Sequence, residues 1–216
     1  MPHDHDDHDH AHGHHHHGLS PSGHPYRPDD DTTLSRFQVM EIALRELLIE
    51  KGIATAPEIM AQVERMDARA WTDSAFKARL LADGSAACRE MGIEVDALKL
   101  VVVENTPQVH NVVVCTLCSC YPRNLLGLPP DWYKTRAYRS RVVREPRAVL
   151  AEFGTHLPDD VRVQVHDSTA DMRYLVLPAR PAGTDGWSAE RLAELVGRDA
   201  MIGVTLARAP EEPAPA

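Results

Sequence analysis

The sequence predicts an α+β protein, in which an N-terminal helical arm precedes a layered α-β-β-α domain with a cysteine-rich loop. Three patterns support this fold class. Apolar side chains recur at helical spacing across residues 34–48. Two later runs, 100–103 and 112–114, consist mostly of β-branched residues and are bounded by polar or turn residues, which is typical of buried strands. Residues 161–165 then alternate between apolar and polar side chains, as a half-exposed strand does.

The arm is expected to contain three helices, of which the first is the stretch at 34–48. Residues 55–58, Thr-Ala-Pro-Glu, have the pattern of a capping box with proline in the first turn, and they predict a second helix toward Met66. A third helix is expected over about 73–91, before Gly92. We assign these helices to packing and not to chemistry.

The second half of the chain is expected to add helices and strands around the cysteine loop. The strand at 161–165 should lie beside a strand at 173–177, in antiparallel pairing. Ser188 is suited to cap a helix that continues to Val196. The other expected elements are two helices and a last strand, at 131–144, 146–153 and 201–206.

Four segments are expected: a His/Asp-rich tail (1–31), the helical arm (32–92), the α+β domain (93–208) and a frayed end (209–216). The tail holds most of the chain's 13 histidines, interleaved with Asp, Gly and Pro, and we expect it to be disordered. Its imidazoles and carboxylates would bind nickel, cobalt or zinc loosely. The tail is either a purification artefact or a natural metal-gathering segment, and its interrupted histidine runs favour the second.

Composition excludes several classes of protein. A length of 216 residues favours one globular domain with an appendage, and a hydrophobic fraction of 43% is enough for a core. With a net charge of −9 and no basic face, we expect no nucleic-acid partner. There is no run of about 18 apolar residues and no basic segment followed by an apolar stretch, so neither a membrane span nor a secretory signal is expected. The expected location is the cytoplasm.

The four cysteines are unevenly distributed. Cys115, Cys118 and Cys120 fall in one short loop, while Cys88 is alone in a predicted helix and is expected to be a small buried hydrophobic residue. A disulfide framework would spread its cysteines over distant segments, so the cluster indicates metal or redox chemistry. A structural zinc site needs four ligands, and only His110 or Cys88 could complete one here. A thioredoxin-type dithiol gains nothing obvious from a third cysteine.

The spacing of the cysteines suits a different metal site. Because one residue separates Cys118 from Cys120, their sulfurs can lie on the same side of one metal, with the peptide nitrogens of Ser119 and Cys120 between them. If deprotonated, these amides would complete a plane of two nitrogens and two sulfurs. Cys115 can then bind from one axial side and leave the opposite position open, as a Lewis-acid catalyst requires. Such strongly donating anions favour a small trivalent transition metal over zinc.

The loop Val114–Cys120, Val-Cys-Thr-Leu-Cys-Ser-Cys, resembles the metal loop of nitrile hydratase α subunits. Threonine at the second loop position, here Thr116, marks the cobalt-type members of that family, whereas iron-type members have serine. The resemblance covers most of residues 34–207, so the domain at 93–208 would be metal-binding and catalytic. Further resembling motifs lie at 126–130, 132–134, 138–141, 144–147, 173–174, 180–187, 198–199 and 201–203.

The resemblance implies a lyase that hydrates nitriles to amides at a non-corrin Co3+ centre, with iron less expected. The implied ligands are Cys115 as thiolate, Cys118 as sulfinic acid, Cys120 as sulfenic acid, and the backbone amides of Ser119 and Cys120. Cys118, Ser119 and Cys120 are the candidate catalytic residues. Either the Cys120 sulfenate oxygen or an activated water would attack the nitrile carbon. Ser119 and Tyr121 could order the site or be merely structural.

The family also implies partners for this chain. An α subunit normally joins a β subunit in a heterodimer or heterotetramer, with the site at their interface. Arginines of the β subunit hydrogen-bond the oxidised sulfurs, as charge-assisted pairing favours. This chain alone would then be an incomplete enzyme. We also expect an activator or metallochaperone protein, and a small nitrile as the substrate.

Departures from the family pattern leave alternatives open. Arg123 replaces an aromatic residue, which could favour a polar or anionic substrate, or could form a surface salt bridge. The γ subunit of thiocyanate hydrolase has arginine in the corresponding place and can also begin with a His-Asp tail, whereas 128–130 and 104–107 favour nitrile hydratase. The stretch 59–71 is shorter than in relatives, which abbreviates the arm that normally embraces the partner. In the family, a polar residue upstream of the loop, often glutamine, supports the site. In this chain Asp96 replaces it.

Two functions from other classes are also alternatives. A non-catalytic zinc-binding module would hold zinc on unoxidised cysteines with a fourth protein ligand. A metallochaperone would use the histidine tail to gather cobalt, and it would exchange its metal and show no turnover.

Overall fold

The computed structural model describes residues 40, 47, 56–93, 95, 99–118 and 120–210. Of the predicted helix at 34–48 it describes only Met40 and Leu47, and both are helical. The described residues are mixed helix and strand, which confirms the α+β class at that level. Several predicted features lie outside the described residues: the tail at 1–31, Asp96, Ser119 and the end at 211–216.

The continuous part of the structure begins with α2 (Ala56–Thr72), α3 (Ser74–Ala82) and α4 (Gly84–Glu90). The second predicted helix is present and extends beyond Met66, but the single helix predicted over 73–91 is wrong. Asp83 interrupts it: its backbone is extended (φ −150°, ψ 93°), and its side chain accepts a hydrogen bond from the amide of Ala86 and so caps α4. The break allows a close approach to the next strand, since a Cβ on Gly84 would lie 2.9 Å from the carbonyl oxygen of Leu100.

In the described part of the chain, four strands form two parallel pairs, β1 (Lys99–Glu104) with β4 (Met172–Leu177) and β2 (Val109–Val114) with β3 (Arg162–Asp167). The antiparallel pairing predicted between 161–165 and 173–177 is therefore wrong. Helices α5 to α8 lie between β2 and β3, and such a crossover returns the chain in its original direction, which makes the pair parallel. The register sets Val114 opposite Asp167, at the end of β2 where the cysteine loop begins.

The crossover consists of α5 (Arg123–Leu126), α6 (Asp131–Lys134), α7 (Arg136–Arg141) and α8 (Pro146–Glu152). Helix α8 confirms the prediction at 146–153, but the helix predicted at 131–144 is divided at Thr135. The backbone of Thr135 is extended (φ −64°, ψ 145°), and its hydroxyl accepts from the amide of Tyr138 to cap α7. As at Asp83, a side chain that bonds the local backbone ends one helix and begins the next.

The last helices are α9 (Ala189–Ala193) and α10 (Arg198–Ile202). Ser188 caps α9 as predicted, because its side chain accepts from the amide of Arg191, although α9 ends earlier than expected. The last strand predicted at 201–206 is wrong, because its first residues close α10 and the chain then turns at Gly203 (φ 87°). Gly203 lies tightly against β2: an added Cβ would be 2.0 Å from the carbonyl oxygen of Asn111.

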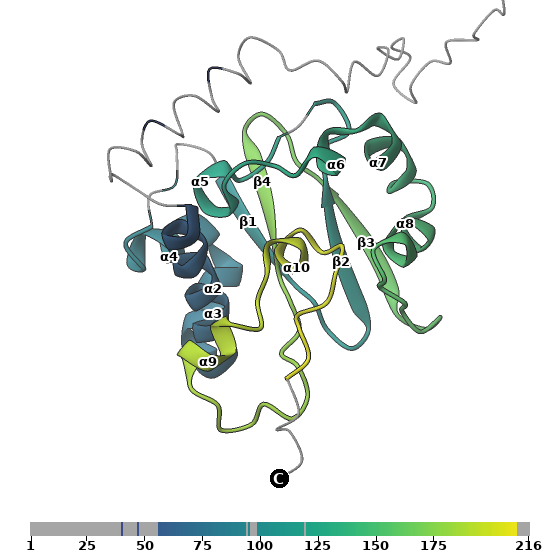
Figure 1. Cartoon of the computed structure of the whole chain (residues 1–216). Helices are drawn as coiled ribbons and strands as arrows, with labels where there is room; N and C mark the ends of the chain where they lie inside the picture. Colours follow the sequence, from purple (N-terminus) through teal and green to yellow (C-terminus); the bar gives the residue numbers. More distant parts are fainter. Residues whose placement is uncertain are drawn as a thin grey trace, which may run out of the picture. The chain divides into compact units, whose positions relative to one another are not determined.

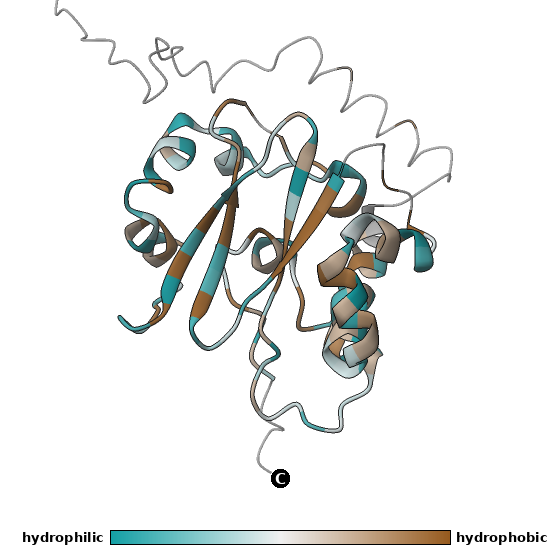
Figure 2. Cartoon of the chain, turned by 180° about the vertical axis from the view of Figure 1, so that it is seen from behind, coloured by the Kyte–Doolittle hydropathy of each residue, from teal (hydrophilic) through white to brown (hydrophobic). Residues whose placement is uncertain are grey.

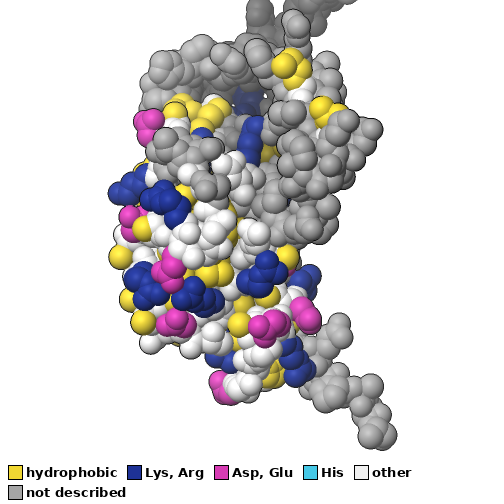
Figure 3. All heavy atoms as spheres, turned by 90° about the vertical axis from the view of Figure 1, so that its left-hand side faces the viewer, with side chains coloured by type: hydrophobic (Ala, Val, Ile, Leu, Met, Phe, Trp, Pro, Cys, Tyr) yellow, Lys and Arg dark blue, Asp and Glu magenta, His cyan; other side chains and the backbone are white. Residues whose placement is uncertain are grey.

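Figure 1 shows α2 to α4 and α9 beside the β1–β4 pair, with α7 and α8 beside the β2–β3 pair. The strands contribute much of the core: the side chains at 112–114 in β2 are almost inaccessible, and Figure 2 shows apolar segments along the strands. The face in Figure 3 carries side chains of both charges interspersed. Among the described residues, Glu90 forms ion pairs with Arg69 at 2.9 Å and with Arg79 at 3.1 Å. No helix in the described part of the chain is long and apolar enough to cross a membrane.

Candidate metal centre

The cysteine loop begins directly after β2, whose buried residues fix its first cysteine in the core. Cys115 follows Val114 and is only 1% exposed. Cys118 is exposed, and Cys120 is half-buried as the chain turns back toward α5. The loop therefore has one sulfur on the core side and two that can be reached from the surface.

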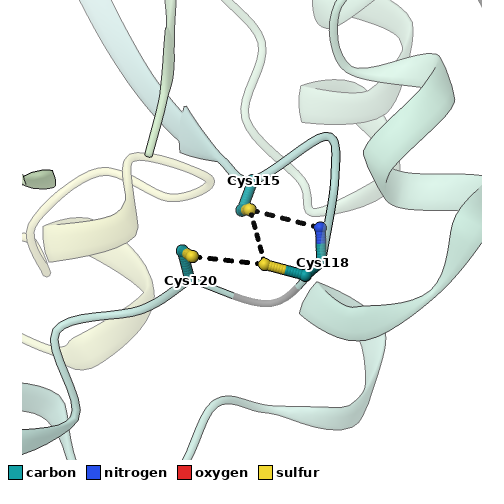
Figure 4. Close-up of side chains that lie close together, drawn as sticks. All are labelled: Cys115, Cys118 and Cys120. Atoms are coloured by element: carbon teal, nitrogen blue, oxygen red, sulfur yellow. Dashed lines mark hydrogen bonds between the residues drawn. The ribbon is translucent and has the colours of Figure 1, made fainter. Parts of the chain in front are cut away.

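The three thiols converge on one point (Figure 4). The sulfur of Cys118 lies 3.4 Å from that of Cys115 and 3.2 Å from that of Cys120. All three sulfurs lie within 4.8 Å of one another. The amide of Cys118 donates to the sulfur of Cys115 at 3.3 Å, which tightens the turn between them. The sulfurs therefore converge as the cysteine spacing predicts, and they form a compact set of donors that could hold one metal ion.

Side chains from outside the loop bond Thr116, the residue after the first cysteine. Asp167, at the end of β3, accepts from the Thr116 amide with one carboxylate oxygen (2.9 Å) and from its hydroxyl with the other (2.6 Å). Arg139 of α7 donates to the Thr116 carbonyl at 3.3 Å and to the carbonyl of Lys134 at 2.9 Å. All three polar groups of Thr116 are therefore engaged by residues that are distant in the sequence.

Two buried tyrosines hold the backbone on either side of the cluster. The hydroxyl of Tyr133 donates to the carbonyl of Cys120 at 2.9 Å. The hydroxyl of Tyr138 donates to the carbonyl of Val113, in β2, at 2.6 Å. The two rings belong to a group of aromatic side chains in which Trp132 packs edge-on against both of them.

The surroundings of Cys120 disfavour its thiolate in the absence of a metal. Burial, together with the neighbouring sulfurs of Cys118 and Cys115, raises the pKa of the Cys120 thiol to about 12. Metal binding must therefore displace a proton from this sulfur at neutral pH. Burial likewise raises the pKa of the Tyr133 phenol, so this group stays protonated and acts as a donor.

The donor set fits a thiolate-bound metal, but it does not complete a tetrahedral zinc site. Among the described residues, no fourth Cys, His, Asp or Glu side chain joins the cluster. The two residues that could have completed it are engaged elsewhere. The Nε2 atom of His110 lies 2.8 Å from the carbonyl oxygen of Gly203. Cys88 is buried, as predicted, with its sulfur 3.7 Å from the sulfur of Met66.

The other residues singled out from the sequence have different positions. Ser119 lies outside the described residues, so its amide and hydroxyl are not described. Tyr121 is buried, and its hydroxyl has no hydrogen-bond partner in the described part of the chain. Arg123 is exposed at the start of α5. Sequence reasoning missed Asp167, because only the register of β3 against β2 brings it to the loop.

Comparison with known proteins agrees with this geometry. The family described as nitrile hydratase, alpha chain, matches residues 35–205. A cobalt-containing nitrile hydratase subunit alpha from Pseudonocardia thermophila is 50% identical over 197 residues, which cover 85% of this chain and 97% of that protein. A thiocyanate hydrolase subunit gamma from Thiobacillus thioparus is 42% identical over 196 residues, which cover 80% of this chain and 81% of that protein.

A solved structure gives the same relationship in three dimensions. A double mutant of the Fe-type nitrile hydratase from Comamonas testosteroni Ni1 superimposes with a TM-score of 0.69 at 42% sequence identity, and the match covers 85% of this chain and 98% of that one. Sequence identity of 42–50% over 81–98% of the length of each relative is far above what shared fold alone produces. The chain therefore belongs to the nitrile hydratase α-chain family.

Proposed function

We propose that this chain is the metal-binding catalytic α subunit of a nitrile hydratase, which adds water to a nitrile to give an amide. The observation that carries the proposal is the convergence of Cys115, Cys118 and Cys120 within 4.8 Å, in a loop with the motif Val-Cys-Thr-Leu-Cys-Ser-Cys. Membership of the nitrile hydratase α-chain family supports the reaction.

The proposed metal is non-corrin Co3+. Thr116 and the cobalt-containing relative from Pseudonocardia thermophila favour cobalt, while the Fe-type structure keeps iron as the second choice. The proposed ligands are the sulfurs of Cys115, Cys118 and Cys120 and the backbone amides of Ser119 and Cys120. We propose that dioxygen oxidises Cys118 to sulfinic acid, a four-electron step, and Cys120 to sulfenic acid, a two-electron step, since accessible thiolates at a metal are the sulfurs most open to oxidation.

A bound trivalent metal supplies Lewis acidity, which makes the nitrile carbon more electrophilic. Cys115 is buried, whereas Cys118 is exposed and Cys120 is half-buried. These exposures support approach of the substrate from the side of Cys118 and Cys120. The proposed nucleophile is the Cys120 sulfenate oxygen or a water molecule held beside it, with Ser119 and Cys118 as the other catalytic residues. One water is consumed for each nitrile, and its two hydrogens end on nitrogen. If water attacks, its oxygen becomes the amide oxygen. If the sulfenate attacks, the sulfenate oxygen enters the amide and the oxygen of the water replaces it on the sulfur of Cys120.

A β subunit is the proposed partner, in a heterodimer or heterotetramer. The tip of the cysteine loop supports a partner that covers it, because Leu117 is 79% exposed beside the exposed Cys118. A large apolar side chain next to reactive sulfur is expected to be covered in the working enzyme. An activator protein that delivers the metal is proposed as a second partner.

Thiocyanate hydrolysis is the alternative activity, and Arg123 is the observation that favours it. This cation is exposed at the start of α5, three residues after Cys120, where it could attract an anionic substrate. The relative from Thiobacillus thioparus, which is named thiocyanate hydrolase subunit gamma, is 42% identical. The identity to the cobalt-containing nitrile hydratase is higher, at 50%.

The test is elemental analysis of the full chain, co-expressed with its β subunit and activator in medium that contains cobalt. A variant with serine at positions 115, 118 and 120 provides the matched control, because it keeps the histidine tail and so measures cobalt held there. We expect the wild type to hold about one more cobalt ion than the control, as one site requires. We also expect only the wild type to hydrate an alkyl or aryl nitrile.

Equal cobalt in the two proteins, or zinc bound at the loop of the wild type, would contradict the proposal and leave a structural module. A parallel assay with thiocyanate separates the two enzymes: thiocyanate turnover without nitrile turnover would favour the alternative. Mass spectrometry of the loop peptide checks the proposed oxidation states of Cys118 and Cys120.

A further inference from the structure

The carboxylate of Asp167 makes a two-point contact with the cysteine loop. One oxygen accepts from the backbone amide of Thr116 at 2.9 Å, and the other accepts from its hydroxyl at 2.6 Å. A distance of 2.6 Å is typical of a strong hydrogen bond from a hydroxyl to a carboxylate. The contact joins residues 51 positions apart in the chain, so it forms only after the fold has formed.

The sheet brings Asp167 to this position. Asp167 ends β3 and pairs in register with Val114, the last residue of β2 and the residue before Cys115. The next residue, Ser168, donates its amide to the carbonyl of Val114 at 2.7 Å, which extends the pairing to the base of the loop. The parallel pair therefore fixes the carboxylate beside the first turn of the loop.

A carboxylate near three sulfurs could be a further metal ligand, but its contacts argue otherwise. Both oxygens of Asp167 are occupied by donors of Thr116. In the described part of the chain, the group of side chains that could hold one ion contains the three cysteines and not Asp167. The contacts of Asp167 are therefore those of a hydrogen-bond acceptor that holds the loop.

We infer that Asp167 is a positioning residue for the metal loop: it holds Thr116 so that the three cysteine sulfurs converge before a metal binds. The inference rests on the proposed function of the loop. Thr116 lies between Cys115 and Cys118, so fixing its amide and hydroxyl restricts the backbone that separates their sulfurs. If the loop is already ordered when folding is complete, metal binding does not have to provide the free energy for ordering it. The loop then binds the metal more tightly.

The test follows cobalt capture by the reduced full-length chain. Co2+ is added under exclusion of oxygen, and the thiolate-to-cobalt charge-transfer absorption reports only metal that sulfur binds, so the histidine tail does not contribute. The variants are Asp167→Ala, Asp167→Asn and Thr116→Val, with Asp171→Ala as the matched control. Asp171 is an exposed aspartate in the turn after β3. Thermal unfolding followed by circular dichroism accompanies each titration.

We expect Asp167→Ala to weaken apparent cobalt binding by about threefold to tenfold, which is the range for losing hydrogen bonds to a carboxylate that water can reach. Thr116→Val, which loses only the hydroxyl contact, should show a smaller loss. Asp167→Asn should lie between Asp167→Ala and the wild type, because its amide oxygen still accepts from the Thr116 amide. Asp171→Ala should bind as the wild type does, and the unfolding midpoints should stay close together.

Equal cobalt binding by Asp167→Ala, Thr116→Val and the wild type would overturn the inference and leave the proposed function intact. A loss in Asp167→Ala that is matched by its unfolding midpoint, without any loss in Thr116→Val, would equally assign Asp167 a general structural role. Absence of the sulfur-to-cobalt absorption in the wild type itself would overturn the inference, because the loop would then not be ready to capture metal. The proposed function would fall with it only if the co-expressed complex also held no more cobalt than its triple-serine control.

Discussion

The hydroxyl of Tyr133 donates a hydrogen bond of 2.9 Å to the carbonyl oxygen of Cys120. Tyr133 is fully buried, and its ring lies edge-on to that of Tyr121 with the centroids 5.1 Å apart. Because burial raises the pKa of Tyr133, the phenol remains a donor throughout the physiological pH range. The core of the protein thus extends to the last sulfur ligand proposed for the metal.

Replacing Tyr133 with phenylalanine is expected to weaken the hold on Cys120 while it preserves the ring packing. We expect a loss of about 1 kcal/mol in the free energy of unfolding, together with lower cobalt retention and slower nitrile hydration. Tyr138→Phe is the matched control, because Tyr138 bonds the carbonyl of Val113 in β2 and not the loop. Chemical denaturation and cobalt content should be measured on both variants. Similar cobalt loss in both would show that the effect is general destabilisation.

The cysteine loop was predictable because its chemistry is local. Cys115, Cys118 and Cys120 lie within six consecutive residues, and this spacing largely determines how far apart their sulfurs can be. Strand pairing is not local, and nothing in 161–165 or 173–177 indicates which strand each one pairs with. The crossover of α5 to α8 makes the β2–β3 pair parallel, and β4 pairs with β1. The predicted contact between these two strands failed for that reason, and Asp167 was missed with it.

The ends of the helices were also harder to predict from the sequence than their presence. Single helices were predicted over 73–91 and 131–144, and the structure divides both of them. Asp83 and Thr135 mark the two breaks, since the side chain of each caps the helix that follows it. Apolar periodicity reports which face is buried, whereas capping residues report where a helix must stop.

Cys88 and Cys118 should respond in opposite ways to alanine substitution. Cys88 is buried, and burial, helped by the negative charge of Asp67, raises the pKa of its thiol to about 12. Cys88→Ala should therefore lower the free energy of unfolding by about 1 kcal/mol through lost packing, with unchanged cobalt content. Cys118→Ala should abolish tight cobalt binding with little effect on folding, since Cys118 is exposed. Metal analysis and thermal unfolding distinguish the two, and cobalt loss in Cys88→Ala would contradict this assignment.

Asp67 is expected to destabilise the protein at neutral pH. It is fully buried, neither carboxylate oxygen has a partner among the described residues, and burial followed by the charge of Glu64 raises its pKa well above the usual range. The folded protein therefore holds a proton that the unfolded chain releases above about pH 4, so this residue's contribution declines as pH rises through the folded pKa. Asp67→Asn should be more stable than the wild type at pH 7, with the difference disappearing near about pH 4.

Asp73 serves as the comparison for that experiment, because its pKa is shifted in the opposite direction to that of Asp67. Its carboxylate accepts from the amide of Phe76 at 2.9 Å, and this contact lowers its pKa. Its stabilising effect is present above its unfolded pKa and is lost as pH falls through the lowered folded value. Asp73→Asn should therefore be less stable than the wild type at neutral pH. A gain of stability in both variants, measured by denaturation at several pH values, would point to net charge and not to the two environments.

His110 should make the protein less stable in mild acid. The side-chain oxygen of Asn105 accepts from the amide of Asn111 at 2.7 Å, so the Asn105 amide nitrogen faces Nδ1 of His110 at 3.3 Å. We infer that Nδ1 accepts, and that Nε2 carries the proton donated to the carbonyl of Gly203 at 2.8 Å. A second proton on the ring would set two donors against each other. Burial also lowers the pKa of this imidazole from 6.5.

The unfolded chain then takes up a proton below about pH 6.5 that the folded protein resists, so stability should fall as pH drops from 6.5 through the lowered folded pKa. Burial lowers the pKa of His166 as well, which adds to the slope in the same direction. His110→Gln should be less stable at pH 7.5 by about 1 kcal/mol or more, but with a shallower decline toward about pH 5. His156→Gln, which removes an exposed imidazole, is the matched control. A decline as steep in His110→Gln as in His156→Gln would place the acid sensitivity outside this buried ring.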